Sequence, residues 1–388
     1  MITVEAALAR LFALVTPMPV EIVALRHAAG RILAYPVQAL RDQPPFAASA
    51  MDGYAIRADF SPGSTLTIIG EAAAGRGFSG SVGPGEAVRI FTGAPMPSGA
   101  EIVAIQEDVT RHESEITLGR NVGPANMRPL GADFRRGDSL AAPRRLSASD
   151  IALLAAMNIA GVPVTRRPVV AIIATGDELV QPGEVPGPDQ IIASNSYGLH
   201  ALLRETGAEP RLLPIARDTL ASLAFNLDLA AGADLILTIG GASVGDHDLV
   251  GQAAGIAGME QAFYKVAMRP GKPLMAGRLN TSMMIGLPGN PVSAMVCGHV
   301  FVVPVIRAML GLPAVPALRQ PAVLAAALPA NGPREHYVRA WRGPDGMTAF
   351  AKQDSSLLTV LSAADCLIVQ PPGDAARHIG EVVQIIPI

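Results

Sequence analysis

The chain has 388 residues, of which half are hydrophobic and only 16% are charged, and its formal net charge is −3. This length exceeds one ordinary core and predicts about two to four domains. The near-neutral charge and the lack of basic runs argue against nucleic acid as a partner. A charged share well below the usual value of roughly 25% indicates extensive burial, with some surface hidden in an oligomer.

Targeting signals are not evident in the sequence. The N-terminus carries Glu5 and no basic run, so it does not resemble a signal peptide. The longest apolar stretch, residues 291–306, is interrupted by polar residues and a proline and predicts a core helix rather than a membrane span. Cys297 and Cys366 lie in apolar surroundings and are interpreted as buried thiols. We therefore expect a cytoplasmic protein without membrane contact.

The predicted secondary structure of the N-terminal part changes twice along the chain. Residues 3–15 and 20–34 have helix-like apolar spacing. Short β-like runs separated by Gly and Pro clusters follow over 41–142, and a helix capped by Ser147 is expected over 146–159. These patterns predict an N-terminal helical domain, residues 1–40 plus 143–167, with a β module, 41–142, inserted into it.

The C-terminal part contains two further predicted domains. Strands alternate with helices over 168–311, including helices at 194–205 and 219–231, which predicts a mostly parallel α/β sheet covered on both faces. A proline-rich linker, 312–321, follows. Five short strand-like runs over 318–388 predict a small β-barrel or sandwich.

One strand-like run, residues 234–239, ends in a glycine-rich segment that carries acidic residues. Glycines at a strand end let the backbone approach an anion, and a following helix offers free N–H groups to it. Neighbouring carboxylates would repel phosphate unless a hard cation such as Mg²⁺ lay between them. The segment therefore predicts a phosphate and magnesium corner, built from Gly240, Gly241, Ser243, Gly245, Asp246 and Asp248.

Two other strand-like runs end in the same manner. The run at 169–174 leads into Thr175, Gly176, Asp177 and Glu178, and the run ending near 287 leads into Pro288, Gly289, Asn290, Pro291 and Ser293. In open α/β sheets ligands bind outside the carboxyl ends of the strands, so one shared pocket is expected. A proline at the first helical position loses no hydrogen bond, so the second turn is also a plain strand-to-helix turn.

A basic row, Lys265, Arg269 and Lys272, lies between the second and third of these loops. If the segment is a strand, Lys265 and Arg269 share one face. Two cations on one face suit an oxyanion such as phosphate. The spacing does not fit a Walker A loop, because position 266 is valine and Pro273 follows the lysine.

These motifs together resemble a known family. TGDEL, SNSYGL, TIGGASVGDHD, KVAMRPGKP, GLPGNPVSA and the upstream PFAASAMDGYA are similar to the motifs of MoeA proteins, the molybdopterin molybdenumtransferases, and of the gephyrin E domain. They occur in family order and cover roughly the whole chain. The resemblance implies a MogA-like central domain and a role in molybdenum cofactor biosynthesis. It also implies Mg²⁺-dependent insertion of molybdenum from molybdate into adenylylated molybdopterin, with release of AMP.

The resemblance also implies roles for individual residues. Asp52 would reach the active site of the partner subunit in a homodimer, and a MogA-type adenylyltransferase would be a transient partner. The catalytic set would be Asp52, Asp133, Glu178, Asp218, Asp248, Lys265 and Arg269, with Glu178, Asp218 and Asp248 near the metal. The substrate would be held by the three loops named above, together with Ser194 of the SNSYGL motif. Arg339 and Ser355 or Ser356 are near further cleft positions.

Several alternatives stay open. Asp52 is also compatible with a turn aspartate that caps its own backbone, and Asp218 with the N-cap of the helix at 219–231. The sequence does not separate metal-binding from proton-transferring carboxylates. Two other functions remain: an adenylyltransferase, which would leave the flanking domains unexplained, and a non-catalytic molybdopterin-binding scaffold, which would tolerate loss of the acidic residues.

Overall fold

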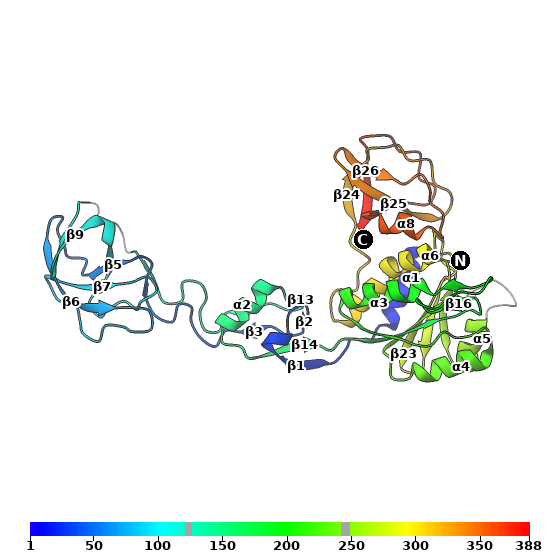
Figure 1. Cartoon of the computed structure of the whole chain (residues 1–388), viewed down its shortest axis with the longest axis horizontal. Coiled ribbons are helices and arrows are strands. Elements are labelled where there is room, and N and C mark those ends of the chain that lie inside the picture. Colours follow the sequence, from blue (N-terminus) through cyan, green and yellow to red (C-terminus); the bar gives the residue numbers. More distant parts are fainter. Residues whose placement is uncertain (121–125, 242–248) are drawn as a thin grey trace. The chain divides into compact units, whose positions relative to one another are not determined.

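The computed structural model describes residues 1–120, 126–241 and 249–388 (Figure 1). The chain divides into two compact units, one formed by Met1–Glu21 with Thr165–Ile388 and the other by Ile22–Val164. The first unit contains the predicted α/β sheet and the C-terminal strands. The second unit is inserted between its two segments.

The core of the first unit is a six-stranded sheet with the order β18-β15-β19-β23-β22-β20. Its first four strands are parallel to one another, and β22 pairs antiparallel with both β23 and β20, so the expected mostly parallel sheet is present. The strands are β15 (Val169–Ala174), β18 (Glu209–Leu212), β19 (Leu235–Ile239), β20 (Glu260–Tyr264), β22 (Met275–Leu279) and β23 (Ser282–Leu287).

Two groups of helices cover the two faces of this sheet. On one face, α4 (Leu220–Leu229) and α5 (Leu249–Ile256) cover a core that includes Ile173, Ile236 and Met284. Alternate strand residues point to the other face, where α3 (Ser194–Thr206) packs against β15, α6 (Pro291–Cys297) and α7 (Val303–Met309). The helices expected at 194–205 and 219–231 are therefore confirmed.

The apolar run after the third loop forms a continuous helix, Pro291–Met309, with a π-helical segment, Gly298–Val302, in its middle. By length and composition alone this helix could cross a membrane, but 78% of its most apolar window is buried inside the protein. It was predicted as a core helix, and its burial fits that prediction.

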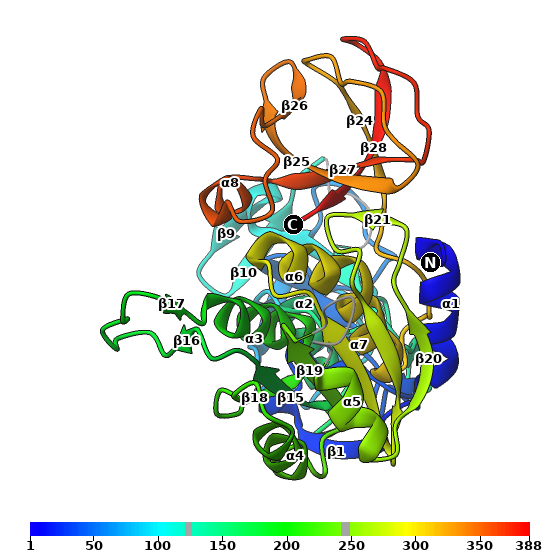
Figure 2. The ribbon, with the colours of Figure 1, turned by 90° about the vertical axis from the view of Figure 1, so that its right-hand side faces the viewer.

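The N-terminal helix α1 (Val4–Leu14) belongs to the first unit. It packs against β20, β22 and α7, and Figure 2 shows its ribbon beside β20. Arg10 donates to the carbonyl of Ala262, and Arg278 donates to the carbonyl of Leu14. The sequence had placed residues 1–40 in one domain with 143–167, but the division of the structure falls between Glu21 and Ile22.

The helix expected over 20–34 was wrong. The segment forms β1 (Val20–Ala24), a short 3₁₀ turn (Leu25–His27) and β2 (Ile32–Leu33). Its β-branched residues favour an extended chain, and β1 and β2 both flank β14 (Gly161–Thr165) in a four-stranded sheet that ends with β13 (Arg144–Arg145). The helix α2 (Ala148–Ala156) is present, and Ser147 caps it through a reciprocal box with Asp150.

The rest of the second unit consists of short strands, as predicted for 41–142. A six-stranded sheet has the order β8 (Ile102–Ile105), β5 (Gly53–Ile56), β7 (Glu86–Ile90), β6 (Thr65–Ala72), β10 (Glu115–Leu118) and β9 (Val109–His112). Two small pairs complete it: β4 (Ala48–Ser49) with β11 (Met127–Arg128), and β3 (Val37–Gln38) with β12 (Ser139–Leu140).

The C-terminal segment contains the five expected strands: β24 (Gln320–Val323), β25 (Glu335–Gly343), β26 (Gly346–Ala349), β27 (Cys366–Gln370) and β28 (Val382–Pro387). The order is β21-β25-β27-β28-β24, with β26 on β25, and a bridge joins Leu324 to Met347. The strand β21 (Met268–Arg269) comes from the α/β segment, and a short helix, α8 (Leu358–Ser362), follows β26. Pairing of β21 with β25 links the two parts of this unit.

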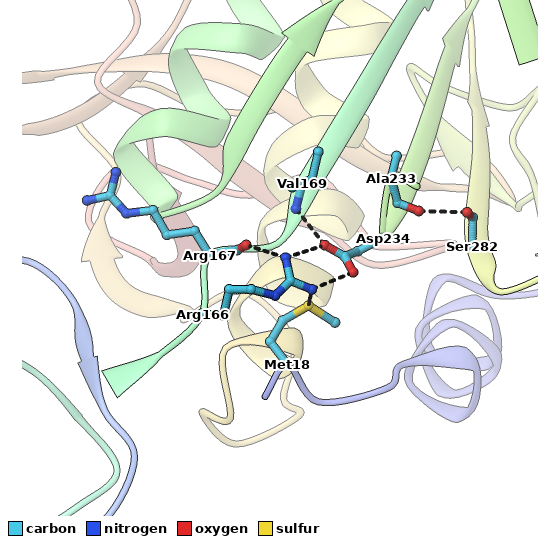
Figure 3. A network of polar contacts seen from close by, with 7 residues as sticks. All are labelled: Met18, Arg166, Arg167, Val169, Ala233, Asp234 and Ser282. Carbon is cyan, nitrogen blue, oxygen red and sulfur yellow. Dashed lines mark hydrogen bonds and ion pairs between the residues drawn. The ribbon is translucent and has the colours of Figure 1, made fainter. Parts of the chain in front are cut away.

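An ion pair fixes the place where the chain returns from the second unit (Figure 3). Two nitrogens of the Arg166 guanidinium donate to the two carboxylate oxygens of Asp234, at 3.0 and 2.7 Å. Asp234 also accepts from the amide of Val169, and Arg166 contacts the sulfur of Met18. The amide of Arg166 donates to the carbonyl of Pro19. Residues 18–19 and 166–169 are therefore held at the start of β19.

This geometry predicts that Arg166→Met destabilises the first unit. The Asp234 side chain is only 18% exposed, so loss of its partner would leave a partly buried charge. We expect a loss of about 2 kcal/mol in the free energy of unfolding, measured by urea titration. Arg211→Met, on the exposed edge strand β18, is the control and should change stability by less than about 0.5 kcal/mol. Equal effects of the two variants would contradict this role for the ion pair.

Candidate active site

A cleft of about 840 Å³ lies where β15, β19 and β23 end. The parallel register pairs Ala174 with Ile239 and Ile239 with Leu287, so the three strands end at the same level. The three following loops consequently meet in one cavity, as expected from the strand ends. Predicted site residues that line the cleft are Thr175, Gly176, Glu178, Ser194, Asp218, Gly240, Gly241, Pro288, Gly289, Asn290 and Pro291.

The loop after β15 presents one of its two acids to the cleft. Glu178 lines the cavity, whereas Asp177 accepts a hydrogen bond from the amide of Asp218. Arg217 braces the loop, because its guanidinium donates to the carbonyls of Asp177 and Leu179 at 3.0 and 3.2 Å. Asp218 also lines the cleft.

Asp218 is not the N-cap of the following helix. Thr219 occupies that position, and its side chain accepts from the amide of Ser222. The helix therefore begins one residue later than an aspartate cap would require. The Asp218 carboxylate is consequently not engaged in capping and is available to the cleft.

The loop after β19 requires glycine for its backbone. Gly240 and Gly241 have positive φ values of +91° and +65°. A Cβ at Gly240 would lie 2.8 Å from the carbonyl oxygen of Thr175, and one at Gly241 would lie 2.4 Å from a methyl of Val250. These glycines thus let the loop pack closely on the neighbouring strand end and on α5. Ser243, Gly245 and Asp248 of the same motif lie outside the described residues.

The loop after β23 is held by contacts from both sides. The amide nitrogen of the Asn195 side chain donates to the carbonyl of Gly289 at 2.7 Å. The backbone N–H of Val292 donates to the carbonyl of Ser355 at 3.0 Å. Pro291 opens the helix as predicted. Ser293 was expected to face the ligand, but it is 4% exposed and does not line the cleft, because it lies on the buried side of α6.

The C-terminal segment contributes Ser356 to the same cleft. Both the amide and the hydroxyl of Ser356 donate to the Asp354 carboxylate, at 2.9 and 2.6 Å. Arg339 does not line the cavity. It is 1% exposed, and it donates to Gln353 and to the carbonyl of Asp354 beneath the loop. Burial lowers the pKa of its guanidinium. Of the C-terminal positions considered, Ser356 alone reaches this cleft.

The basic row differs from the prediction. Lys265 and Arg269 do not share the face of one strand, because Lys265 follows β20 with φ +72° and Arg269 belongs to β21. The Lys265 ammonium lies over the ring of Tyr264, 5.1 Å from its centroid. Neither residue lines the cleft, although the neighbouring Pro273 does. The expected arrangement failed because a left-handed residue interrupts the extended chain.

Asp52 and Asp133 belong to the second unit. One carboxylate oxygen of Asp52 accepts from both the amide and the hydroxyl of Thr92, each at 2.8 Å. These hydrogen bonds, with a smaller contribution from Arg89, hold the pKa of Asp52 below its usual value. Asp133 lines a separate cavity of about 680 Å³ that also contains Arg41 and Arg128. Asp52 thus contacts a neighbouring threonine, not merely its own backbone.

A divalent cation would find two carboxylates in the cleft, Glu178 and Asp218. Within the three described ranges, no group of three or more His, Cys, Asp or Glu side chains is arranged to hold a metal ion. Two carboxylates fit Mg²⁺, which commonly binds one or two such groups and completes its shell with water and substrate phosphates.

Some cleft residues were not singled out from the sequence. Asn195 belongs to the SNSYGL motif, yet only Ser194 was selected from it. Leu179, Ile191 and Ile192 form a small parallel pair, β16 (Leu179–Val180) with β17 (Ile191–Ile192), that borders the cavity. Its strands are too short for a periodic signal, but the Pro and Gly residues between them mark a turn.

Three family models match consecutive parts of the chain. The MoeA N-terminal region (domain I and II) matches residues 2–158, a probable molybdopterin binding domain matches 171–308, and the MoeA C-terminal region (domain IV) matches 321–388. The chain belongs to the MoeA family. The first and third models flank the α/β domain, so the resemblance to this family is confirmed over nearly the whole chain.

Individual relatives agree with this assignment. The molybdopterin molybdenumtransferase of Nostoc sp. is 37% identical over 95% of this chain and 88% of its own length. That of Bacillus subtilis is 34% identical over 95% and 90%. A crystal structure of a molybdopterin biosynthesis MoeA protein from Pyrococcus horikoshii has a TM-score of 0.86 at 28% identity and is covered completely, as is this chain. This chain is thus an enzyme of molybdenum cofactor biosynthesis.

The cleft predicts opposite outcomes for two of its glycines. A Cβ at Gly289 would meet only the Cα of Gly240, at 3.4 Å, so Gly289→Val should fold and place its side chain in the cavity. We expect its affinity for molybdopterin, measured by calorimetry, to fall about tenfold or more. Gly255→Ala, where a Cβ meets nothing within 4 Å, is the control and should bind like the parent.

Gly241→Val should instead lower the melting temperature, because its positive φ and its contact with Val250 do not accept a side chain. Unchanged affinity in folded Gly289→Val would mean that this turn does not contact the ligand.

Proposed function

We propose that this enzyme inserts molybdenum from molybdate into adenylylated molybdopterin, with Mg²⁺ bound in the cleft and AMP released. The observation that carries the proposal is the meeting of three strand ends in one cavity that contains both Glu178 and Asp218. Glycine backbone and carboxylates in a single cleft suit a substrate that combines phosphate with a divalent cation. The relatives that bear the name molybdopterin molybdenumtransferase support the same reaction.

Each residue of the cleft has a distinct role in the proposed reaction. Gly289, where a side chain would meet only the Cα of Gly240, leaves room for the phosphate end of the substrate. Glu178 and Asp218 would hold Mg²⁺, which when bound polarises the pyrophosphate linkage and stabilises the charge that leaves with AMP. Asn195 and Arg217 keep the surrounding loops in place through the carbonyls of Gly289 and Asp177. Asp248 and Ser243 of the same motif are assigned to this site by resemblance alone.

Asp52 and Asp133 act in the proposal through the partner subunit. We infer a homodimer in which Asp52 of one subunit completes the cleft of the other, because the sequence is poor in charge and its acidic motifs fall into two compact units. Lys265 and Arg269 are assigned to molybdate binding at the margin of the site. We place the enzyme in the cytoplasm on the basis of the sequence.

The direct test is incubation of the purified protein with adenylylated molybdopterin, Mg²⁺ and molybdate. We expect AMP release that depends on both molybdate and Mg²⁺, together with formation of active cofactor. Removal of divalent cations with a chelator should abolish release, and added Mg²⁺ should restore it. Tight binding of adenylylated molybdopterin without molybdate-dependent AMP release would contradict the proposed enzyme and support a non-catalytic scaffold.

Glu178→Gln provides a second test at the level of one side chain. The substitution keeps size and removes the charge that faces the cleft. We expect a loss of turnover of about tenfold for each 1.4 kcal/mol of transition-state stabilisation removed, with substrate binding largely retained. Asp177→Asn is the matched control, because its carboxylate contacts the Asp218 amide rather than the cleft. Parent turnover in Glu178→Gln would remove Glu178 from the mechanism.

The shared site is tested by complementation. Asp52→Ala and Glu178→Gln chains should each be inactive alone, and verified heterodimers should regain part of the parent activity. If the cleft is shared, one of the two clefts in such a heterodimer contains both Glu178 and Asp52 in their parent form, and the other cleft contains neither. Absence of recovery would mean that each cleft is completed within one chain.

A further inference from the structure

Arg89 lies on β7 directly opposite Tyr54 of β5, in the strand pair that begins at Gly53, the residue after Asp52. Its guanidinium is 5.0 Å from the centroid of the Tyr54 ring and 4.7 Å from that of the Phe91 ring. A planar guanidinium stacks on aromatic faces while its edges keep their hydrogen-bond donors. The two rings therefore restrict the position of the Arg89 guanidinium, and its N–H groups remain free to donate to nearby acceptors.

Those donors reach the backbone around Asp52 by two routes. One nitrogen donates to the carbonyl of Gly53 at 3.0 Å, and the other donates to the side-chain oxygen of Gln106 at 2.8 Å. The backbone N–H of Gln106 in turn donates to the carbonyl of Asp52 at 3.1 Å. Two successive peptide carbonyls, those of Asp52 and Gly53, are thus fixed by Arg89 and by the residue that it orients.

The Asp52 carboxylate is held on one side only. Both hydrogen bonds from Thr92 reach the same oxygen, Oδ1, and among the described residues Oδ2 has no hydrogen-bond partner. Thr92 follows β7, three residues after Arg89 in the sequence. The strand that carries Arg89 therefore also supplies the group that holds the carboxylate, and Oδ2 is left free to act outside the unit.

We propose that Arg89 is a positioning residue for Asp52: it fixes the backbone from which the carboxylate projects and keeps positive charge beside it. It touches neither substrate nor metal, and it acts through Gly53 and Gln106. The role rests on the proposed function, because it matters for turnover only if Asp52 completes the cleft of the partner subunit. Lysine cannot replace it, since one ammonium does not reach both acceptors in a planar fork.

The alternative is that Arg89 merely joins β5 to the β7 and β8 sides of its sheet. A structural link of this kind would affect the melting temperature but not the titration of Asp52. Thr92 contributes most to lowering the pKa of Asp52, and the charge of Arg89 adds to it. Loss of Arg89 should therefore raise the pKa of Asp52, so that a larger share of the carboxyl is protonated at low pH and activity is lost at a higher pH than in the parent.

The experiment compares Arg89→Met, Arg89→Lys and Arg76→Met in the full-length protein. Arg76 lies in the same unit and pairs with Glu71 on the surface, where its side chain is 78% exposed, so its variant controls for loss of one arginine. The Asp52 carboxyl is followed by carbon NMR against pH in protein labelled at aspartate, with Asp52→Asn identifying the signal. Turnover is followed as molybdate-dependent AMP release.

For Arg89→Met we expect a raised pKa of Asp52 and a kcat lowered about tenfold with KM changed less than about twofold. Arg89→Lys should restore the pKa in part but not the turnover, and Arg76→Met should match the parent in both. An unchanged Asp52 titration with parent kcat in Arg89→Met would overturn the proposal. A lower melting temperature with an unchanged titration would also overturn it and leave a structural link.

Two outcomes are kept separate by this design. If the parent protein releases no AMP, the proposed function fails, whereas the titration of Asp52 still decides whether Arg89 positions it. If Arg89→Met does not fold, Gln106→Leu removes the acceptor of one guanidinium nitrogen and is measured in the same way. A shift of the Asp52 pKa in Gln106→Leu supports the proposal, and a parent-like titration contradicts it.

Discussion

The in-register parallel pairing of β15, β19 and β23 is the constraint on which the site depends. Because Ala174, Ile239 and Leu287 lie at one level of the sheet, the loops that follow have no freedom to separate. Each loop then meets a different local requirement. The first needs a brace from Arg217, the second needs left-handed glycines, and the third needs a proline that opens a helix. A slip of one residue in either pairing would turn the loop residues toward the opposite face.

The sheet also explains why the supporting groups come from distant parts of the chain. Asn195, in the first turn of α3, donates to the carbonyl of Gly289, and the carbonyl of Ser355 in the C-terminal segment accepts from the first turn of α6. The third loop is therefore fixed from both sides, by one side-chain and one backbone hydrogen bond to its main chain. Loops placed in this way on a rigid scaffold change little when a ligand binds, which lowers the entropic cost of binding.

Much of this arrangement could be predicted from the sequence because its signals are local. Apolar runs that end in glycine identified the three strand ends, and the family motif singled out Glu178, although Asp177 and Glu178 lie in a turn rather than on an extended chain. The capping box at Ser147 and the proline at the start of α6 are also local signals. Signals of this kind require only a few neighbouring residues.

Other features depend on contacts that no short window contains. Residues 20–34 have helix-like spacing, but pairing of β1 and β2 with β14 makes them extended. The positive φ of Lys265 separates it from the strand of Arg269, and Ser293 faces the core because α6 packs on α3. The side to which a short segment turns is decided by its distant partner. Asp52 and Arg89 show the same dependence, since neither reveals from sequence that Gln106 joins them.

The pairing of β1 with β14 has a consequence for the order in which the molecule forms. Helix α1 packs on β20, β22 and α7, which are made by the ribosome only after the whole of the inserted unit. The apolar side of α1, including Leu8 and Leu11, therefore has no partner during that interval. The inserted unit can fold by itself in the meantime, because its core clusters lie within its own residues. Once it has folded, β1 and β14 bring residues 21 and 165 together, so the loop to be closed between α1 and the elements it packs on is shorter by the inserted residues. The folded insertion thus lowers the entropic cost of closing the chain when α1 packs on its sheet.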